Sequence, residues 1–148
     1  MLNYEELIEE AKKESIGRFV VAAIIVKNSK ILLLKRKKDD FMGGIYELPS
    51  GKVEDNEEID LSLKREIKEE TGLKIKEIKK YFGFFDYESK SGKKTRQFNF
   101  LVETDLDDLK LSDEHEDFSW VSKTELSNFN ITDSVKEVLA KVDFKSNI

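Results

Sequence analysis

Residues Gly51–Leu73 read GKVEDNEEIDLSLKREIKEETGL, and this stretch decides the fold of the chain. It holds eight acidic residues against four basic ones, a local charge of −4 that makes up most of the chain's net −5. The part from Glu58 to Thr71 lacks Gly and Pro and is predicted to be a helix that ends at Gly72. Like charges three and four residues apart destabilise a helix unless a cation neutralises them. The stretch therefore predicts a helix that binds a cation.

Three carboxylates of this helix share one side. At about 100° per residue, Glu70 and Glu69 lie about 40° and about 60° to either side of Glu66. The apolar stripe that must face the core occupies overlapping angles: Ile59, Leu63 and Ile67. A cleft or an edge of the core is therefore expected to hold the carboxylates, although a solvated Glu/Lys surface remains the alternative. Oxygen ligands without sulfur or histidine select Mg²⁺ or Mn²⁺, and Mg²⁺ commonly binds substrate phosphates as well.

The whole chain has the composition of one globular domain. It has 148 residues, of which 39% are apolar and 39% charged, and residues 1–148 are expected to form a single domain. Without cysteine it has no disulfides, thiolate metal sites or Cys nucleophile, which fits a cytoplasmic protein. The acidic N-terminus does not resemble an export signal, and the longest apolar runs are too short to cross a bilayer. Net negative charge without a basic stripe argues against binding of nucleic-acid polymers.

Hydrophobic periodicity predicts a mixture of helices and strands. Helices are expected at Tyr4–Glu14, 124–126 and Asp133–Val142, besides the acidic helix. Strands are expected at Phe19–Val26 (buried on both faces), Ile31–Arg36 (its hairpin partner), Ile45–Leu48, Ile75–Tyr87 (with a bulge at Gly83), Thr95–Glu103 and Phe118–Val121. An acidic loop is expected at Asp105–Asp117, and a solvated hairpin turn that includes Lys93, Lys94 and Arg96. This mixture predicts an α/β sandwich with a mixed sheet.

The spacing of the acidic stretch matches a known motif at every specified position. Gly51, Glu57, Arg65-Glu66-Ile67, Glu69-Glu70 and Gly72-Leu73 stand where the Nudix box has them, so the chain resembles the Nudix hydrolase superfamily, in particular MutT-like members. Ser50 replaces the first glycine of the usual Gly-Gly pair. The resemblance extends weakly to Tyr46–Ser50 and to Asp113–Val121.

The resemblance implies a fold and an activity. The fold is the Nudix fold, an α/β/α sandwich with a mixed β-sheet in which the box forms loop-helix-loop. The activity is Mg²⁺-dependent hydrolysis (Mn²⁺ as a substitute) of a nucleoside diphosphate linked to another group X, with nucleoside triphosphates, oxidised ones included, as leading substrates. The partner is thus a small nucleotide, not a polymer or a membrane, and a homodimer is left open. Two alternatives remain. Glu114-His115 followed by Trp120 resembles dinucleoside polyphosphate (Ap4A-type) hydrolases, and a non-catalytic nucleotide- or ADP-ribose-sensing domain is disfavoured by the intact box.

The resemblance also implies roles for individual residues. The implied metal ligands are the Gly51 carbonyl, Glu66, Glu69 and Glu70. Arg65 is implied to orient the glutamates, notably Glu57. The carboxylate that takes the proton of the attacking water is Glu69 within the box, or Glu114 outside it with Glu116 as the next choice.

Substrate contacts are expected from residues before and after the box. Arg36, Tyr46 and Glu47 are the candidates: Arg36 for a phosphate and Tyr46 for stacking on a base. A strand-end surface cation is an equally good interpretation of Arg36. Core packing is expected for Phe82 and Phe84. The only histidine, His115, is interpreted as a surface or substrate-edge residue, with a general acid as the alternative.

Overall fold

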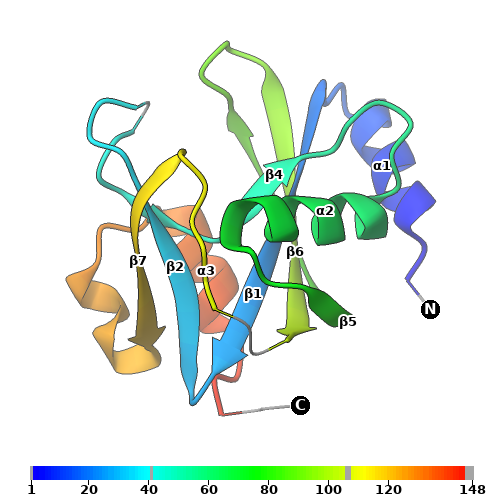
Figure 1. The fold of residues 1–148 in the computed structure, drawn as a ribbon. Helices are drawn as coiled ribbons and strands as arrows, with labels where there is room; N and C mark the ends of the chain where they lie inside the picture. Colours follow the sequence, from blue (N-terminus) through cyan, green and yellow to red (C-terminus); the bar gives the residue numbers. More distant parts are fainter. Residues whose placement is uncertain (1, 41, 106–107, 146–148) are drawn as a thin grey trace.

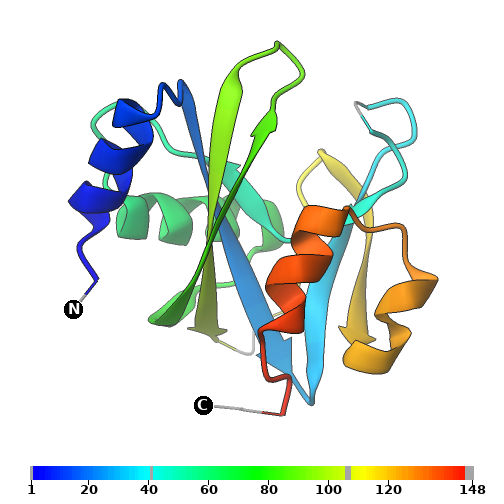
Figure 2. The ribbon, with the colours of Figure 1, turned by 180° about the vertical axis from the view of Figure 1, so that it is seen from behind.

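A mixed sheet with helices on both faces forms the protein (Figures 1 and 2). The computed structural model describes residues 2–40, 42–105 and 108–145. Helices α1 (Tyr4–Lys13) and α2 (Ile59–Thr71) pack on one face, and α3 (Asp133–Ala140) with the 3-10 helix η1 (Lys123–Asn128) packs on the other. The predicted α/β/α sandwich is confirmed. In the described part of the chain, no helix combines the length and hydropathy needed to cross a membrane.

Seven strands make up the sheet. They are β1 (Arg18–Lys27), β2 (Lys30–Arg36), β3 (Tyr46–Glu47), β4 (Ser50–Lys52), β5 (Ile75–Glu88), β6 (Lys94–Thr104) and β7 (His115–Ser122). Their order is β3-β2-β1-β6-β5, with β4 paired to β1 and β7 to β2. Among the strands of the described residues, β1 and β6 run parallel and the other pairs are antiparallel, so the sheet is mixed as predicted.

The first hairpin diverges soon after its turn, and this divergence positions the site. β1 and β2 pair only at Val26–Ile31 and Lys27–Lys30. Farther from the turn, β1 pairs with β4 and β2 pairs with β3 and β7. The chain between β3 and β4 therefore crosses from one diverging strand to the other (Figure 1). It delivers Ser50 and Gly51 beside helix α2, which follows them in sequence.

Two hydrophobic cores lie on the two faces of the sheet. Alternate residues of β1 enter different cores: Val21, Ala23 and Ile25 face α1 and α2, whereas Ala22 and Ile24 face α3. This confirms the prediction of a strand buried on both faces. The apolar stripe of α2, with Leu63 and Ile67 fully buried, packs on the first core.

Element bounds follow the sequence pattern closely, with two differences. β4 was missed because three residues containing a glycine carry no periodic signal. β7 begins at His115, so the predicted acidic loop is too long at its C-terminal end. Within the sheet β7 pairs only with β2, and an edge strand can carry exposed charged side chains such as Glu116 and Asp117. The bulge at Gly83, where φ is +85°, is confirmed by a register shift between Tyr81 and Phe84.

Arg96 is buried, contrary to the predicted solvated turn. Its side chain is 2% exposed, and its Nε and Nη2 donate to the two carboxylate oxygens of Asp86 at 2.7 and 2.9 Å. Nη1 donates to Glu14 at 2.9 Å, and the guanidinium lies 3.8 Å from the ring centroid of Phe84. Phe84 is itself 45% exposed, so its predicted core position is wrong. The cause is register: Arg96 is on the face of β6 that also carries Phe98, where the end of α1 covers it.

Arg96→Met is expected to lower the free energy of unfolding by about 2 kcal/mol, because three charge-assisted hydrogen bonds are lost while Asp86 and Glu14 stay accessible to water. Urea titration measures this change. Lys94→Met is the matched control, since Lys94 is an exposed cation on the same strand. Equal losses in the two variants would contradict the structural role of Arg96.

Candidate functional site

Arg65 gathers the glutamates of the box around one guanidinium. Its Nε and Nη2 donate to both carboxylate oxygens of Glu57, each at 2.8 Å. Nη1 donates to Glu66 at 2.7 Å and to Glu69 at 3.0 Å, and Nη2 also reaches the carbonyl of Lys52 at 3.2 Å. The hydrogen bonds from Arg65 lower the pKa of Glu57 to about 2. The guanidinium of Arg65 therefore joins the loop before α2 to the helix itself.

Glu66 lies directly against the backbone of Gly51. The space that a Cβ on Gly51 would need is occupied by the carboxylate of Glu66. Glycine is required at this position for close approach, not for an unusual φ, since its backbone is not in the left-handed region. Partial burial raises the pKa of Glu66 despite its contact with Arg65.

Glu70 is a buried carboxyl group beside other carboxylates. It is 6% exposed, and its Oε1 accepts a hydrogen bond from the backbone N–H of Ser50 at 2.8 Å. Burial, together with the nearby charges of Glu47, Glu114 and Glu66, raises the pKa of Glu70 to about 9. A buried carboxyl group that resists ionisation is an arrangement that a bound cation would relieve.

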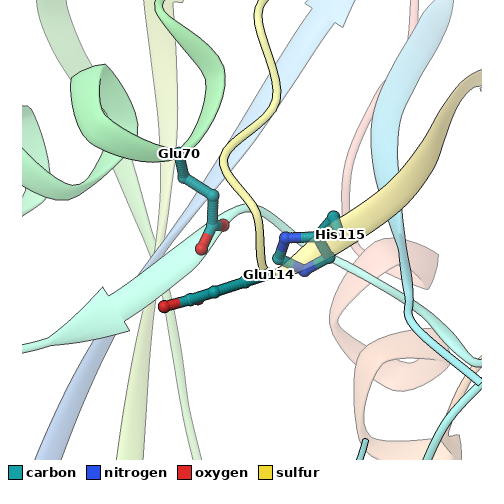
Figure 3. Close-up of side chains that lie close together, drawn as sticks. All are labelled: Glu70, Glu114 and His115. Carbon is teal, nitrogen blue, oxygen red and sulfur yellow. The ribbon is translucent and has the colours of Figure 1, made fainter. Parts of the chain in front are cut away.

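Glu114 and His115 approach Glu70 from the start of β7 (Figure 3). One ligand atom from each of the three side chains lies within 4.8 Å of the other two. His115 is 6% exposed, so the interpretation as a surface residue is wrong. Pairing of His115 with Arg36 across β7 and β2 buries the ring, a long-range effect with no local sequence signal.

Glu47 links His115 to Arg36. Its Oε2 lies 2.7 Å from Nε2 of His115, and its Oε1 accepts a hydrogen bond from Nε of Arg36 at 3.0 Å. Two of the predicted substrate contacts, Arg36 and Glu47, are thus bound to each other. Arg36 and Glu47 both line a pocket.

The pocket of about 180 Å³ lies on the α3 side of this cluster. Its lining includes Arg36, Tyr46, Glu47, Ser50 and Gln97. Tyr46, the third predicted substrate contact, also borders the pocket. Its ring meets the ring of Phe129 edge to face, with 4.9 Å between the centroids. Because Glu47 and Ser50 contact the residues around Glu70, the pocket and the carboxylates adjoin one another.

Gln97 is a pocket residue that the sequence analysis did not single out. Its Nε2 donates to Oδ1 of Asn99 at 3.0 Å, and Asn99 in turn donates to the carbonyl of Gly83 at 3.1 Å. Both amides are buried within β6. The available signal was the alternation of two polar residues, Gln97 and Asn99, with two phenylalanines. The prediction missed it because it considered only the apolar face of that strand.

Two candidate proton acceptors, Glu69 and Glu116, are directed away from the buried carboxyl group of Glu70. The side chain of Glu69 is 57% exposed and is directed to Arg65. Glu116 points to Lys35, with which it forms an ion pair at 3.8 Å. Phe82 packs beside the second core, as expected. Of the two candidate bases outside the box, Glu114 is therefore the one that the structure brings next to Glu70.

The raised pKa of Glu70 predicts how stability of the metal-free protein depends on pH. The folded state keeps a proton up to about pH 9, whereas an unfolded glutamate loses it near 4.5. The contribution of Glu70 to stability is therefore full below pH 4.5 and is lost as pH rises towards 9. Urea unfolding in a chelator across this interval should show a decline in the wild type that is reduced in Glu70→Gln. Identical pH profiles for the two proteins would contradict this prediction.

Comparisons with known proteins identify the family of the chain. The model of the NUDIX domain family matches residues 17–142. The 8-oxo-dGTP diphosphatase of Buchnera aphidicola subsp. Schizaphis graminum is 36% identical over 111 residues, which are 75% of this chain and 82% of that protein. Nucleoside triphosphatase NudI of Escherichia coli O81 is 28% identical over 132 residues, 82% of this chain and 94% of the relative.

A solved structure supports the same relationship. The MutT protein from Methanosarcina mazei Go1 is 28% identical, with a TM-score of 0.76, over 88% of this chain and 96% of that one. The family match covers most of the chain, and the box, the fold and these relatives agree. The chain therefore belongs to the Nudix family and is a Nudix pyrophosphohydrolase.

Proposed function

We propose that residues 1–148 act as one Nudix domain that hydrolyses nucleoside triphosphates, oxidised ones included, with a divalent cation. The observation that carries the proposal is the buried Glu70 carboxyl group, which faces Glu114 and adjoins a pocket for part of a nucleotide. Ionising Glu70 in this place requires a compensating positive charge.

The residues around Glu70 fit a divalent metal. The donors would be the carboxylates of Glu66 and Glu70, the Gly51 carbonyl and Glu114, which immediately precedes β7, with Glu69 at the exposed rim. The contact of Glu66 with Gly51 leaves no room for a side chain there, as expected where a backbone carbonyl and a carboxylate serve one ion. When bound, such an ion neutralises the diphosphate and lowers the pKa of a coordinated water.

The chain's own residues orient these donors and accept a proton. Arg65 is proposed to fix the positions of the Glu57, Glu66 and Glu69 carboxylates through the hydrogen bonds described above. Glu114 is the preferred acceptor for the proton of the attacking water, through the carboxylate oxygen that does not bind the ion. Its carboxylate makes no hydrogen bond or ion pair within the described residues, whereas Glu69 is engaged by Arg65. Glu69 remains the alternative base.

The pocket is proposed to bind the nucleoside base. Pockets that enclose drug-sized ligands measure about 300–1,000 Å³, so a pocket of about 180 Å³ suits the base alone. The phosphates would then lie outside it, towards Glu70 and Glu114. Tyr46 provides an aromatic wall, Arg36 a cation at the rim, and Gln97 a buried amide. The names of the two relatives, an 8-oxo-dGTP diphosphatase and a nucleoside triphosphatase, support a triphosphate substrate.

A substrate panel with product identification tests this proposal. Ordinary nucleoside triphosphates, 8-oxo-dGTP, diadenosine tetraphosphate and ADP-ribose are each incubated with Mg²⁺ or Mn²⁺. Release of pyrophosphate and a nucleoside monophosphate from at least one triphosphate is expected, and a chelator should abolish it. Faster cleavage of diadenosine tetraphosphate than of every triphosphate would favour the dinucleoside polyphosphate alternative. Absence of turnover on the entire panel would refute the proposal.

A further inference from the structure

One nitrogen of His115 is buried without a partner. The side chain is 3% exposed, and Nδ1 has no hydrogen-bond partner among the described residues. A buried polar atom normally has a partner, because an unsatisfied one costs about 1–3 kcal/mol. The missing partner calls for an explanation at this position in particular, since the ring adjoins Glu70 and Glu114.

The environment of the ring defines which nitrogen carries the proton. Nε2 lies 2.7 Å from Glu47, a carboxylate that also accepts a hydrogen bond from Arg36. A carboxylate only accepts hydrogen bonds, so Nε2 carries the proton. Nδ1 is then the ring nitrogen that has no hydrogen-bond partner among the described residues.

The ring of His115 lies beside the carboxylates of Glu70 and Glu114. A nitrogen-bearing edge of the His115 ring faces the carboxylates of Glu70 and Glu114 (Figure 3). One ring nitrogen and one oxygen from each carboxylate lie within 4.8 Å of one another. Neighbouring ligands on a small divalent ion are about 3 Å apart, so these side chains need to approach one another by up to about 2 Å. Glu47, His115 and an ion would then form the carboxylate-histidine-metal arrangement that is common in metalloproteins.

We propose that Nδ1 of His115 is a nitrogen ligand of a divalent ion held by Glu70 and Glu114. This nitrogen shifts the preference of the site from Mg²⁺ towards Mn²⁺ and other transition ions, since Mg²⁺ favours oxygen ligands whereas imidazole suits transition metals. The inference rests on the proposed function for the presence of an ion, but it assigns a further ligand and a different ion preference.

Binding of Mn²⁺ to the untagged, nucleotide-free protein tests the assignment. The chain contains a single histidine, so an imidazole ¹⁴N coupling in the electron spin echo of bound Mn²⁺ can come only from His115. The coupling is expected in the wild type and should disappear in His115→Gln. Glutamine can still donate to Glu47, which preserves the fold. Loss of the nitrogen ligand should weaken Mn²⁺ binding by about tenfold or more and Mg²⁺ binding less.

Two control variants locate the ion. Glu70→Gln should abolish tight Mn²⁺ binding, whereas Glu103→Gln, at a half-exposed carboxylate on β6 that pairs with Lys76 and Lys79, should not change it. The proposal is overturned if bound Mn²⁺ shows no nitrogen coupling, if His115→Gln retains wild-type Mn²⁺ affinity, or if no Mn²⁺ binds. Coupling without turnover of any nucleotide would uphold the ligand and refute the proposed function. Turnover without coupling would uphold the proposed function and refute the His115 ligand.

Discussion

Gly51→Ala will lower kcat/KM for the preferred nucleotide by about 10²-fold or more, because ligand displacements near 1 Å have effects of this size. The new methyl group would occupy the position of the Glu66 carboxylate. That carboxylate is the end of a flexible side chain, so it can move away at little cost in stability. The expected signature is therefore a large loss of activity with a nearly unchanged melting temperature.

Gly17→Ala is the matched control for this substitution. A Cβ at Gly17 meets no atom within 4 Å, and its φ is not in the left-handed region. Activity and melting temperature should both stay near the wild-type values. If Gly51→Ala were as active as Gly17→Ala, the close approach of Glu66 to Gly51 would have no role in catalysis.

Glu70→Gln will lower kcat/KM by about 10³-fold or more, since a metal ligand contributes several kcal/mol to stabilising the transition state and each 1.36 kcal/mol is a factor of ten. The free energy of unfolding without metal should not fall. Glutamine matches the shape of a protonated glutamate, its Oε1 can still accept from Ser50, and no charge has to be buried. Kinetics on the preferred nucleotide and urea unfolding in a chelator measure the two effects.

The informative outcome for Glu70 is this separation of activity from stability. Glu103→Gln provides the comparison, because it removes a half-exposed carboxylate near the C-terminal end of β6 and should preserve activity. A parallel loss of activity and stability in Glu70→Gln would instead mean that Glu70 mainly supports the fold. Retained activity would remove Glu70 from the proposed metal site.

The box and its helix could be predicted from the sequence because their determinants are local. The helix was predicted from Glu58 to Thr71 and spans Ile59–Thr71, with Gly72 at φ +76° as its C-terminal cap. Helical geometry alone placed Glu66 and Glu70 beside the apolar stripe, and both are largely buried. The bond from Arg65 to Glu57 crosses only eight residues and follows from the same motif.

Residues outside the box were less predictable because strand pairing determines their surroundings. Arg96 looks like a turn residue in the sequence, but its place on the inner face of β6 buries it against Asp86 and Glu14. Gln97 reaches the pocket through the opposite face of the same strand. One residue of register separates these two environments.

The sequence by itself determined the mixed α/β class, the acidic helix and the carboxylates that the helix carries. These depend on the spacing of residues within a few turns of one element. Only the tertiary structure decided that β7 brings Glu114 and His115 to Glu70, and that Glu47 engages one nitrogen of His115 while the other stays without a partner. The physical reason is that this juxtaposition depends on the divergence of β1 from β2 and on the pairing of β2 with β7, which are contacts between distant segments.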